Sequence, residues 1–219
     1  MNPTHEGPPG TARRVDHNGN VSTPADPDPP APGPSAVVGT PDTVRAATMA
    51  DVDRIGAITA DAWRDRLRDI LPAHVLESLR PPDLALVWAG ALINPPTPAH
   101  RLLVAIGSGD IAGYAAIGPS TDPDADAATG ELLALEVDPR LQRCGHGSRL
   151  MSAAVDLGRS AGYDTLSTWC PVHDEIRRAF LQSAGWAPDT AVRDLAMQDP
   201  QSADRTLREA RLVTDIRGA

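Results

Sequence analysis

The chain contains no lysine, and all 20 of its Lys and Arg side chains are arginines. A phosphate-binding loop of the GxxxxGK(S/T) type is therefore excluded, because that motif requires the lysine. The formal net charge at pH 7 is −9. An acidic balance argues against nonspecific nucleic-acid binding, which depends on many cationic contacts to phosphates, so we expect no nucleic-acid partner.

Cysteines and long apolar runs are also scarce. Two cysteines, Cys144 and Cys170, are too few for a disulfide scaffold. No segment has the length of a membrane span, and the N-terminus lacks the basic start and apolar run of a signal peptide. We therefore expect a cytoplasmic protein with no membrane partner.

Prolines are concentrated at the N-terminus, where ten of the 22 lie within residues 1–41. This Pro/Gly-rich segment has few apolar residues to bury, so we expect a disordered N-terminal extension. An alternative is that it binds a partner that recognises polyproline II helices. Residues 42–216 are then expected to form one folded domain.

Apolar periodicity after residue 42 predicts an alternation of strands and helices. Residues 100–120 are typical of a hairpin, because two apolar runs surround the turn-forming sequence GSGD. The expected order is strand, helices, hairpin, strand, helix, strand, helix, strand, strand. This order predicts an α/β fold with a mixed central sheet flanked by helices. The other predicted strands are 43–48, 131–137, 164–170, 190–198 and 206–216, and the predicted helices are 49–67, 72–93 (interrupted by two prolines), one ending near 161, and 174–185.

The sequence LQRCGHGSRL, residues 141–150, connects a predicted strand to a predicted helix. Gly145 and Gly147 allow unusual backbone angles and the close approach of a ligand. The first amides of a helix have no intrahelical partner, and the helix dipole adds about half a positive charge there. The loop therefore predicts a site for a phosphate group, with Arg143 and Arg149 adding charge at its rim.

A dinucleotide-binding loop is one alternative for this segment. Such a loop needs a third glycine near position 150, where this chain has Leu150, and its glycines follow the first strand more closely. Asp164 lies at a sequence distance that suits a ribose contact. A nicotinamide-dependent oxidoreductase is therefore kept as an alternative.

Gln142-Arg143-Cys144-Gly145-His146-Gly147 resembles the Q/R-x-x-G-x-G/A signature of the GNAT superfamily of N-acetyltransferases. The surrounding sequence is similar as well. Val137-Asp138-Pro139 lies where the family has V-x-P, Gly185-Trp186 corresponds to its usual Gly-Phe, and residues 43–58 resemble its opening strand and helix. The resemblance covers about residues 43–216.

The resemblance implies an N-acetyltransferase in which acetyl-CoA is the cosubstrate and a primary amine attacks it directly in a ternary complex. The acceptor is expected to be a small-molecule or peptide amine, and a homodimer is expected because the family often dimerises. The pantetheine arm is expected to pair with the backbone of Leu135, Glu136 and Val137. The pyrophosphate is expected at the loop residues Gln142, Arg143, Cys144, Gly145, His146, Gly147 and Ser148.

Glu131 is the candidate general base, because several family members have a catalytic glutamate at this spacing from the signature. In a regular strand Glu131 shares a face with Leu133, Leu135 and Val137, and burial among them raises a carboxyl pKa. A solvated glutamate is the alternative. Glu136 points to the opposite face of a regular strand and is the weaker candidate, although a bulge changes side-chain direction.

Two positions depart from the family pattern. Leu181 stands where many members have a tyrosine that protonates the leaving thiolate, and Asp174 stands where many have an asparagine. Tyr114 and Tyr163 are the remaining hydroxyl candidates, with a structural role as the alternative. These departures leave a noncatalytic acyl-CoA-binding module as a second alternative function.

Two further motifs suggest a metal site. Cys144, His146, Cys170 and His173 follow consecutive strands, and four such ligands suit zinc. The spacing is unusual and Cys144 lies in the proposed cofactor loop, so we expect no metal. The acidic loop 121–130 lacks the glycine and glutamate of a calcium loop. We expect it to be solvated, with the attraction of cationic substrates as the alternative.

Overall fold

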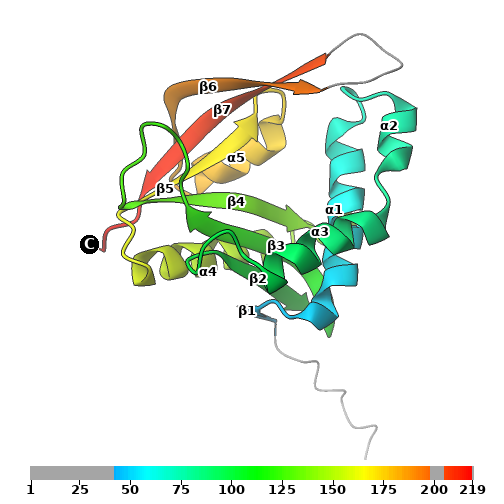
Figure 1. Ribbon diagram of the computed structural model, residues 1–219, viewed down its shortest axis with the longest axis horizontal. Coiled ribbons are helices and arrows are strands. Elements are labelled where there is room, and N and C mark those ends of the chain that lie inside the picture. The colour runs from blue at the N-terminus through cyan, green and yellow to red at the C-terminus, as the bar shows by residue number, and fades with distance from the viewer. Residues whose placement is uncertain (1–41, 198–204, 219) are drawn as a thin grey trace, which may run out of the picture. The chain divides into compact units, whose positions relative to one another are not determined.

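The computed structural model describes residues 42–197 and 205–218, and the predicted N-terminal extension, residues 1–41, lies outside them (Figure 1). The described strands form a seven-stranded sheet in the order β1-β2-β3-β4-β5-β7-β6. β4 and β5 are parallel, and the other neighbouring pairs are antiparallel. The predicted mixed sheet is confirmed. The strands are β1 (Thr43–Ala46), β2 (Arg101–Gly107), β3 (Asp110–Pro119), β4 (Thr129–Val137), β5 (Thr165–Pro171), β6 (Ala187–Met197) and β7 (Arg205–Asp215).

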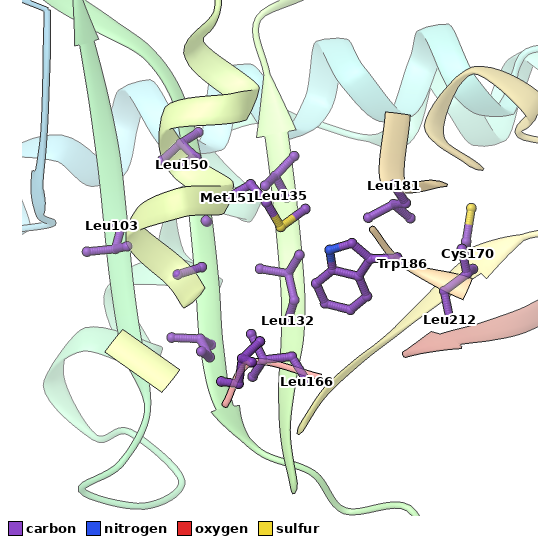
Figure 2. Close-up of a cluster of buried hydrophobic side chains, with 14 of the residues drawn as sticks. Leu103, Leu132, Leu135, Leu150, Met151, Leu166, Cys170, Leu181, Trp186 and Leu212 are labelled. Atoms are coloured by element: carbon purple, nitrogen blue, oxygen red, sulfur yellow. The ribbon is translucent and has the colours of Figure 1, made fainter. Parts of the chain in front are cut away.

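Helices cover both faces of the sheet, and each face has its own apolar cluster. On one face Leu150 and Met151 of α4 lie beside Leu132 and Leu135 of β4 (Figure 2). On the other face buried residues of α1 pack against β2 and β3. None of the described helices is long and apolar enough to cross a membrane. The helices are α1 (Val52–Leu67), α2 (Ala73–Ser78), α3 (Pro81–Ile93), α4 (His146–Ser160) and α5 (Glu175–Ser183).

The segment 72–93 forms two helices, which the proline pair had suggested. Pro81 and Pro82 occupy the first positions of α3 and so begin a helix rather than break one. A proline costs little there, because its missing N–H has no intrahelical acceptor in the first turn. α3 packs against α1, and α1 contains Gly56 within its helical span.

A β-bulge at Leu133 divides β4 into two halves. The pairing of β4 with β3 passes from Leu132 directly to Ala134, so Leu133 has no residue opposite it. The bulge reverses the alternation of side chains, and Leu132 and Leu135 therefore face the same apolar cluster. Glu131 points to the other face of the sheet. The expectation that Glu131 shares a face with Leu135 is wrong, because it assumed a regular strand.

β4 and β5 pair only along their first residues. Thr129–Glu131 pairs with Thr165–Ser167 in parallel, and the pairing then stops although β4 continues to Val137 and β5 to Pro171. Figure 1 shows the two strands separating beyond this point. We call the unpaired side of β4 beyond Glu131 the open edge. It begins directly after the candidate base.

The contact between α1 and α3 requires glycine at position 56. A Cβ there would lie 2.5 Å from Pro81 O and 2.7 Å from Ala85 N, whereas a Cβ at Gly90 of α3 would meet nothing within 4 Å. We expect Gly56→Ala to lower the free energy of unfolding by about 1–3 kcal/mol through overpacking. Gly90→Ala, the matched control, should raise it by about 0.4–1 kcal/mol.

Denaturant unfolding of the wild type and of both variants measures these changes. A Gly56→Ala variant as stable as Gly90→Ala would show that the two helices do not approach as closely as described.

Candidate active site

Asp138 fixes the path of the chain as it leaves β4. Its buried carboxylate accepts hydrogen bonds from Arg140 N at 2.9 Å, Arg140 Nη2 at 2.7 Å and Arg54 Nη2 of α1 at 2.6 Å. These donors, with the Arg140 side chain first, hold the pKa of this carboxyl below its usual range. A charged carboxylate thus positions the short 3₁₀ helix Pro139–Leu141 and the loop that follows it.

Two left-handed residues shape the loop between this 3₁₀ helix and α4. The φ angle is 63° at Arg143 and 83° at Gly145. Positive φ is uncommon for a residue with a Cβ, and the described part of the chain has it at Ser108, Arg143 and Thr190 among its non-glycine residues. Such local strain often accompanies a ligand-binding loop. Gly145 is the N-cap of α4.

The first turn of α4 has the properties of an anion site. The first intrahelical hydrogen bond runs from Arg149 N to Gly145 O at 3.1 Å, so the amides of His146, Gly147 and Ser148 have no acceptor within the helix. The first turn contains no acidic residue, and α4 has 15 residues to build its dipole. The backbone of these predicted loop residues therefore suits a phosphate group.

The side chains of this loop have different surroundings. His146 is buried with its ring against Gly107 of β2, and its Nδ1 lies 2.7 Å from Arg149 Nη2. The same Arg149 nitrogen is 2.8 Å from Asp42 Oδ2. Arg149 thus forms a partly exposed ion pair with Asp42, and its Nη1 lies 3.5 Å from where a Cβ on Gly145 would be, so it remains beside the loop. Arg143 is exposed. That the two arginines add charge at the rim stays a prediction.

The open edge of β4 presents alternate backbone groups. Asp138 N donates to a carbonyl of β3, so the backbone of Glu136, two residues earlier, also faces β3. The backbone groups of Leu135 and Val137 then face the open edge. Arg177 of α5 confirms this direction, because its Nη1 donates to Leu135 O at 3.0 Å. Of the three residues predicted to pair with the pantetheine arm, Leu135 and Val137 direct backbone groups to the open edge, and Leu135 O already accepts from Arg177.

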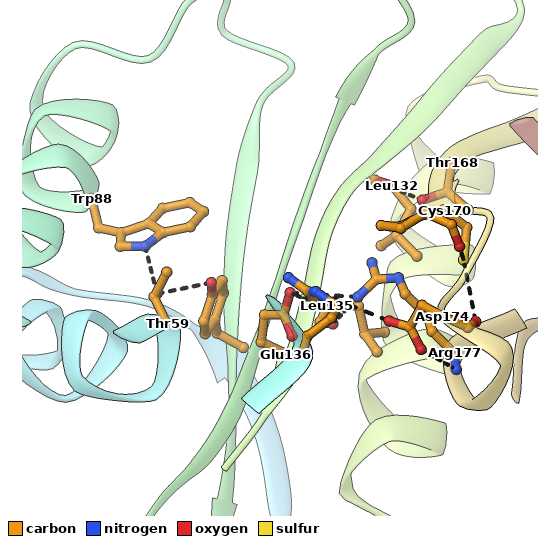
Figure 3. A network of polar contacts seen from close by, with 12 residues as sticks. Thr59, Trp88, Leu132, Leu135, Glu136, Thr168, Cys170, Asp174 and Arg177 are labelled. Atoms are coloured by element: carbon orange, nitrogen blue, oxygen red, sulfur yellow. Dashed lines mark hydrogen bonds and ion pairs between the residues drawn. The ribbon is translucent and has the colours of Figure 1, made fainter. Parts of the chain in front are cut away.

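Glu136 forms a bridge between three elements (Figure 3). It is buried, and its Oε1 lies 2.8 Å from Arg66 Nη1 of α1 and 3.4 Å from Arg177 Nη1 of α5. Arg66 Nε also lies 4.0 Å from Asp174 Oδ2. Two arginines therefore use the carboxylate of Glu136, and its geometry is that of a structural link rather than a free base.

The two tyrosines lie in different surroundings, Tyr114 in a buried polar network and Tyr163 in the apolar cluster on the α4 face of the sheet. Tyr114 is buried, its hydroxyl lies 2.9 Å from Thr59 Oγ1, and burial raises its pKa. Trp88 Nε1 donates to the same Thr59 oxygen at 3.0 Å, which completes a closed network (Figure 3). Tyr163 is buried beside Gly130, and burial raises its pKa as well. Leu181, at the usual tyrosine position, is part of the apolar core.

Glu131 occupies the point where β4 and β5 separate. It is opposite Ser167 in the last parallel pair, and its side chain is on the face away from α4. It is only 8% exposed, and none of the hydrogen bonds in the described residues involves its carboxylate. Burial, and then repulsion from Asp122, raises its pKa. These are the properties expected of a general base that works near neutral pH.

The acidic loop between β3 and β4 is fastened to the sheet. Arg211 of β7 is buried and lies 3.0 Å from Asp122 Oδ2, 2.6 Å from Asp124 Oδ2 and 2.7 Å from Asp189 Oδ2. Trp169 Nε1 also donates to Asp122 Oδ1 at 3.2 Å. Within the loop, the Asp122 side chain is only 11% exposed whereas that of Asp124 is 65% exposed, so the expectation of a solvated loop fails at Asp122 alone. The charged residues of β7 were the sequence signal for this contact.

The cysteines and histidines do not converge. Cys144 is exposed in the loop, whereas Cys170 is buried and its pKa is raised to about 11 by burial. Within the described ranges, no group of three or more His, Cys, Asp or Glu residues is placed to hold a metal ion. The zinc arrangement considered from the sequence is thus not formed by these residues.

Comparisons with known proteins agree with this geometry. The profile of the acetyltransferase (GNAT) family matches residues 61–186. Among curated proteins, the uncharacterized N-acetyltransferase YuaI of Bacillus subtilis strain 168 is 25% identical over 127 residues, which are 58% of this chain and 70% of YuaI.

Solved structures show the same fold. The PaiA N-acetyltransferase of Thermoplasma acidophilum, in complex with coenzyme A, has a TM-score of 0.60 at 13% identity and covers 80% of this chain and 99% of its own. An N-acetyltransferase of Staphylococcus aureus Mu50 has a TM-score of 0.61 at 20% identity, with 81% and 100% covered. YncA of Salmonella typhimurium, solved with its cofactor acetyl-CoA, has a TM-score of 0.54 at 21% identity, with 82% and 96% covered.

The matched region contains the open edge of β4, the anion-binding loop and α5. It spans more than half of the chain. The protein therefore belongs to the acetyltransferase (GNAT) family.

Proposed function

We propose that this protein transfers the acetyl group of acetyl-CoA to a primary amine by direct attack within a ternary complex. One observation carries the proposal. β4 and β5 separate directly beyond Glu131, with the candidate base at one end of the open edge and the free amides of α4 at the other. The arrangement offers one continuous path between an anion site and a base.

The open edge fits the cosubstrate. Leu135 and Val137 direct backbone groups into it, and an amide-containing arm pairs with such groups as an added strand does. The amides of residues 146–148 fit a pyrophosphate. Bound acetyl-CoA supplies an acetyl group activated as a thioester. The coenzyme A and acetyl-CoA present in the PaiA and YncA structures support this assignment.

Glu131 is proposed to remove the proton of the acceptor amine. An amine is protonated near neutral pH and must lose a proton before its nitrogen attacks. The nitrogen then forms a bond to the acetyl carbon while the bond from that carbon to sulfur breaks. The same nitrogen gives its second proton to solvent, which leaves a neutral amide. Leu181 and Tyr163 belong to the apolar cluster beneath α4, and the Tyr114 hydroxyl is hydrogen-bonded to Thr59. Solvent is therefore proposed to protonate the departing thiolate, which is a tolerable leaving group with a pKa of about 8.5.

A noncatalytic acyl-CoA-binding module is the second candidate. The burial of Leu181, which leaves no hydroxyl at that position, favours it. Release of CoA on incubation with a panel of amines distinguishes an enzyme from such a module. The nicotinamide-dependent alternative is set aside, since the chain belongs to an acetyltransferase family.

The remaining expectations from the sequence stay predictions. They are a small-molecule or peptide acceptor, a homodimer, a cytoplasmic location and the absence of nucleic-acid partners. The net charge of −9 supports the last of these.

The first prediction concerns cosubstrate binding. Acetyl-CoA at a hundredfold excess over its dissociation constant should stabilise the protein by about 2.7 kcal/mol. Gly145→Glu should abolish this gain, because it places a carboxylate in the anion site. Gly162→Glu is the matched control. Gly162 follows the C-terminal end of α4, and its φ of 86° is close to the 83° of Gly145, so the same substitution introduces similar backbone strain away from the anion site.

Thermal melting of the three proteins with and without acetyl-CoA measures the effect. The control should melt lower than the wild type but keep its shift with acetyl-CoA. A shift that persists in Gly145→Glu would place the cosubstrate elsewhere.

The second prediction concerns the two thiols. An alkylating reagent should modify Cys144 quickly in the native protein, whereas Cys170 should react only after unfolding because it is buried with a raised pKa. Saturating acetyl-CoA, which has no free thiol, should slow the modification of Cys144. Mass spectrometry follows both sites, with Cys144→Ser to identify the fast reaction. Equal rates with and without acetyl-CoA would argue against the loop as its site.

The third prediction concerns the base. Glu131→Gln should lower kcat/KM for an identified amine by about 10²–10⁴-fold at neutral pH. The pKa of Glu131 in the folded protein is raised above the ordinary glutamate value of about 4.3. Wild-type activity should therefore fall as the pH drops through this raised pKa, because the base becomes protonated. The variant should lose this acid limb and recover partly at high pH, where the amine is deprotonated.

Glu136→Gln serves as the control for the pH profiles of kcat/KM. It should weaken folding, because two partly buried arginines lose their charged partner, but the folded enzyme should keep the acid limb. An unchanged profile in Glu131→Gln would remove Glu131 from this role.

A further inference from the structure

Charged side chains gather on the sheet face that carries Glu131. Ser167 of β5 is opposite Glu131, and Trp169, two residues later, lies on the same face of the strand. Trp169 is in turn opposite Arg211 of β7. Glu209 is two residues from Arg211 on the same face of β7, and it is opposite Arg193 of β6. We call this set, together with the loop aspartates that Arg211 binds, the acidic face. It consists of Glu131, Trp169, Arg193, Glu209, Arg211, Asp122, Asp124 and Asp189.

The acidic face has a negative balance. Five carboxylates and two guanidiniums give −5 + 2 = −3. Both arginines are already engaged by carboxylates of the chain. Arg211 contacts three aspartates, and Arg193 lies 2.8 Å from Glu209 Oε2 with its guanidinium 4.3 Å from the centre of the Trp169 ring. The face therefore has negative charge left over for a ligand to neutralise.

Glu131 is the member without a partner. Only 8% of its surface is exposed, so more than nine-tenths of the residue is buried. No hydrogen-bond donor in the described residues reaches its carboxylate. The charged groups that act on it are Asp122, Arg193, Glu209 and Arg211, so it is directed at the acidic face. Among the described residues, the side-chain atoms that are both fully enclosed and without a partner are Arg149 Nε and Arg177 Nε. The unpaired Glu131 oxygens are not among them and therefore keep some contact with solvent.

We propose that the acceptor is a small aliphatic diamine or polyamine, whose reacting nitrogen approaches Glu131 while a second ammonium group binds the remaining carboxylates of the acidic face. This inference rests on the proposed function and specifies its substrate class. A monoamine loses its only positive charge when it gives up a proton, so its electrostatic attraction to the acidic face is lost before it reacts. A second ammonium group keeps its charge and its attraction throughout.

The same balance favours release of the product. Acetylation converts one ammonium group into a neutral amide, so the product carries one positive charge fewer than the substrate. Its attraction to the acidic face is correspondingly weaker. Acceptors that carry a carboxylate are disfavoured, because they add a negative charge to a face that already holds a net −3.

Steady-state kinetics with diaminobutane and butylamine test the proposal, because the two differ in one terminal ammonium group. We expect kcat/KM for the diamine to be at least tenfold higher, which corresponds to about 1.4 kcal/mol. The preference should shrink as salt is added, because exposed charges are screened. Equal values for both amines, or a preference for an amine with a carboxylate, would overturn this inference and leave the acetyltransferase proposal intact.

Asp124→Asn removes one charge from the acidic face. The Asp124 side chain is 65% exposed, and the Arg211 side chain lowers its pKa to about 2, so it is charged at neutral pH. We expect the variant to lose most of the preference for the diamine. Asp156→Asn is the matched control, since Asp156 is 68% exposed and also pairs with an arginine, but on α4. The control should keep the wild-type preference.

Calorimetric titration of each amine into the protein with bound CoA, where no transfer occurs, separates recognition from catalysis. The diamine should bind at least tenfold more tightly than butylamine. Tight diamine binding in this titration, together with no CoA release when acetyl-CoA is supplied, would contradict the acetyltransferase proposal while supporting the recognition proposed here. Equal binding of both amines would overturn the diamine inference.

Discussion

The separation of β4 from β5 is the constraint on which the rest of the site depends. Parallel pairing ends at Glu131, and the two strands then diverge. Unpaired strand edges are exposed to added strands, and here the opening is held by side chains on both sides. Glu136 joins α1 and α5 across β4 through its two arginines, while Arg177 also binds the open edge at Leu135.

The open edge separates two regions of opposite charge. At one end, α4 directs free amides and a helix dipole toward the loop, without any acidic residue in its first turn. At the other end, Glu131 belongs to a face with surplus carboxylates. Under the function proposed here, an anionic cosubstrate and a cationic acceptor would be attracted to different ends, and each would be disfavoured at the other's site. Their reacting groups would then meet where the strands separate.

Local patterns in the sequence predicted most of the fold. The strands, the helices and their order follow from apolar periodicity over neighbouring residues, and the glycine-containing loop was located with its helix. Contacts between distant residues could not be predicted in this way. Arg211 binds Asp122 across 89 positions, and Arg149 binds Asp42 across 107, so no local pattern reports either contact.

The sequence by itself determined the elements and the glycine-containing loop at residues 141–148, because these depend on residue types at short spacing. Glu131 was chosen as the candidate base through the family resemblance. Only the tertiary structure decided which way that base points. A one-residue bulge at Leu133 reverses the alternation of β4, and whether a strand bulges depends on its pairing with its neighbour. The acidic face likewise exists only because β5, β6 and β7 lie side by side beyond β4.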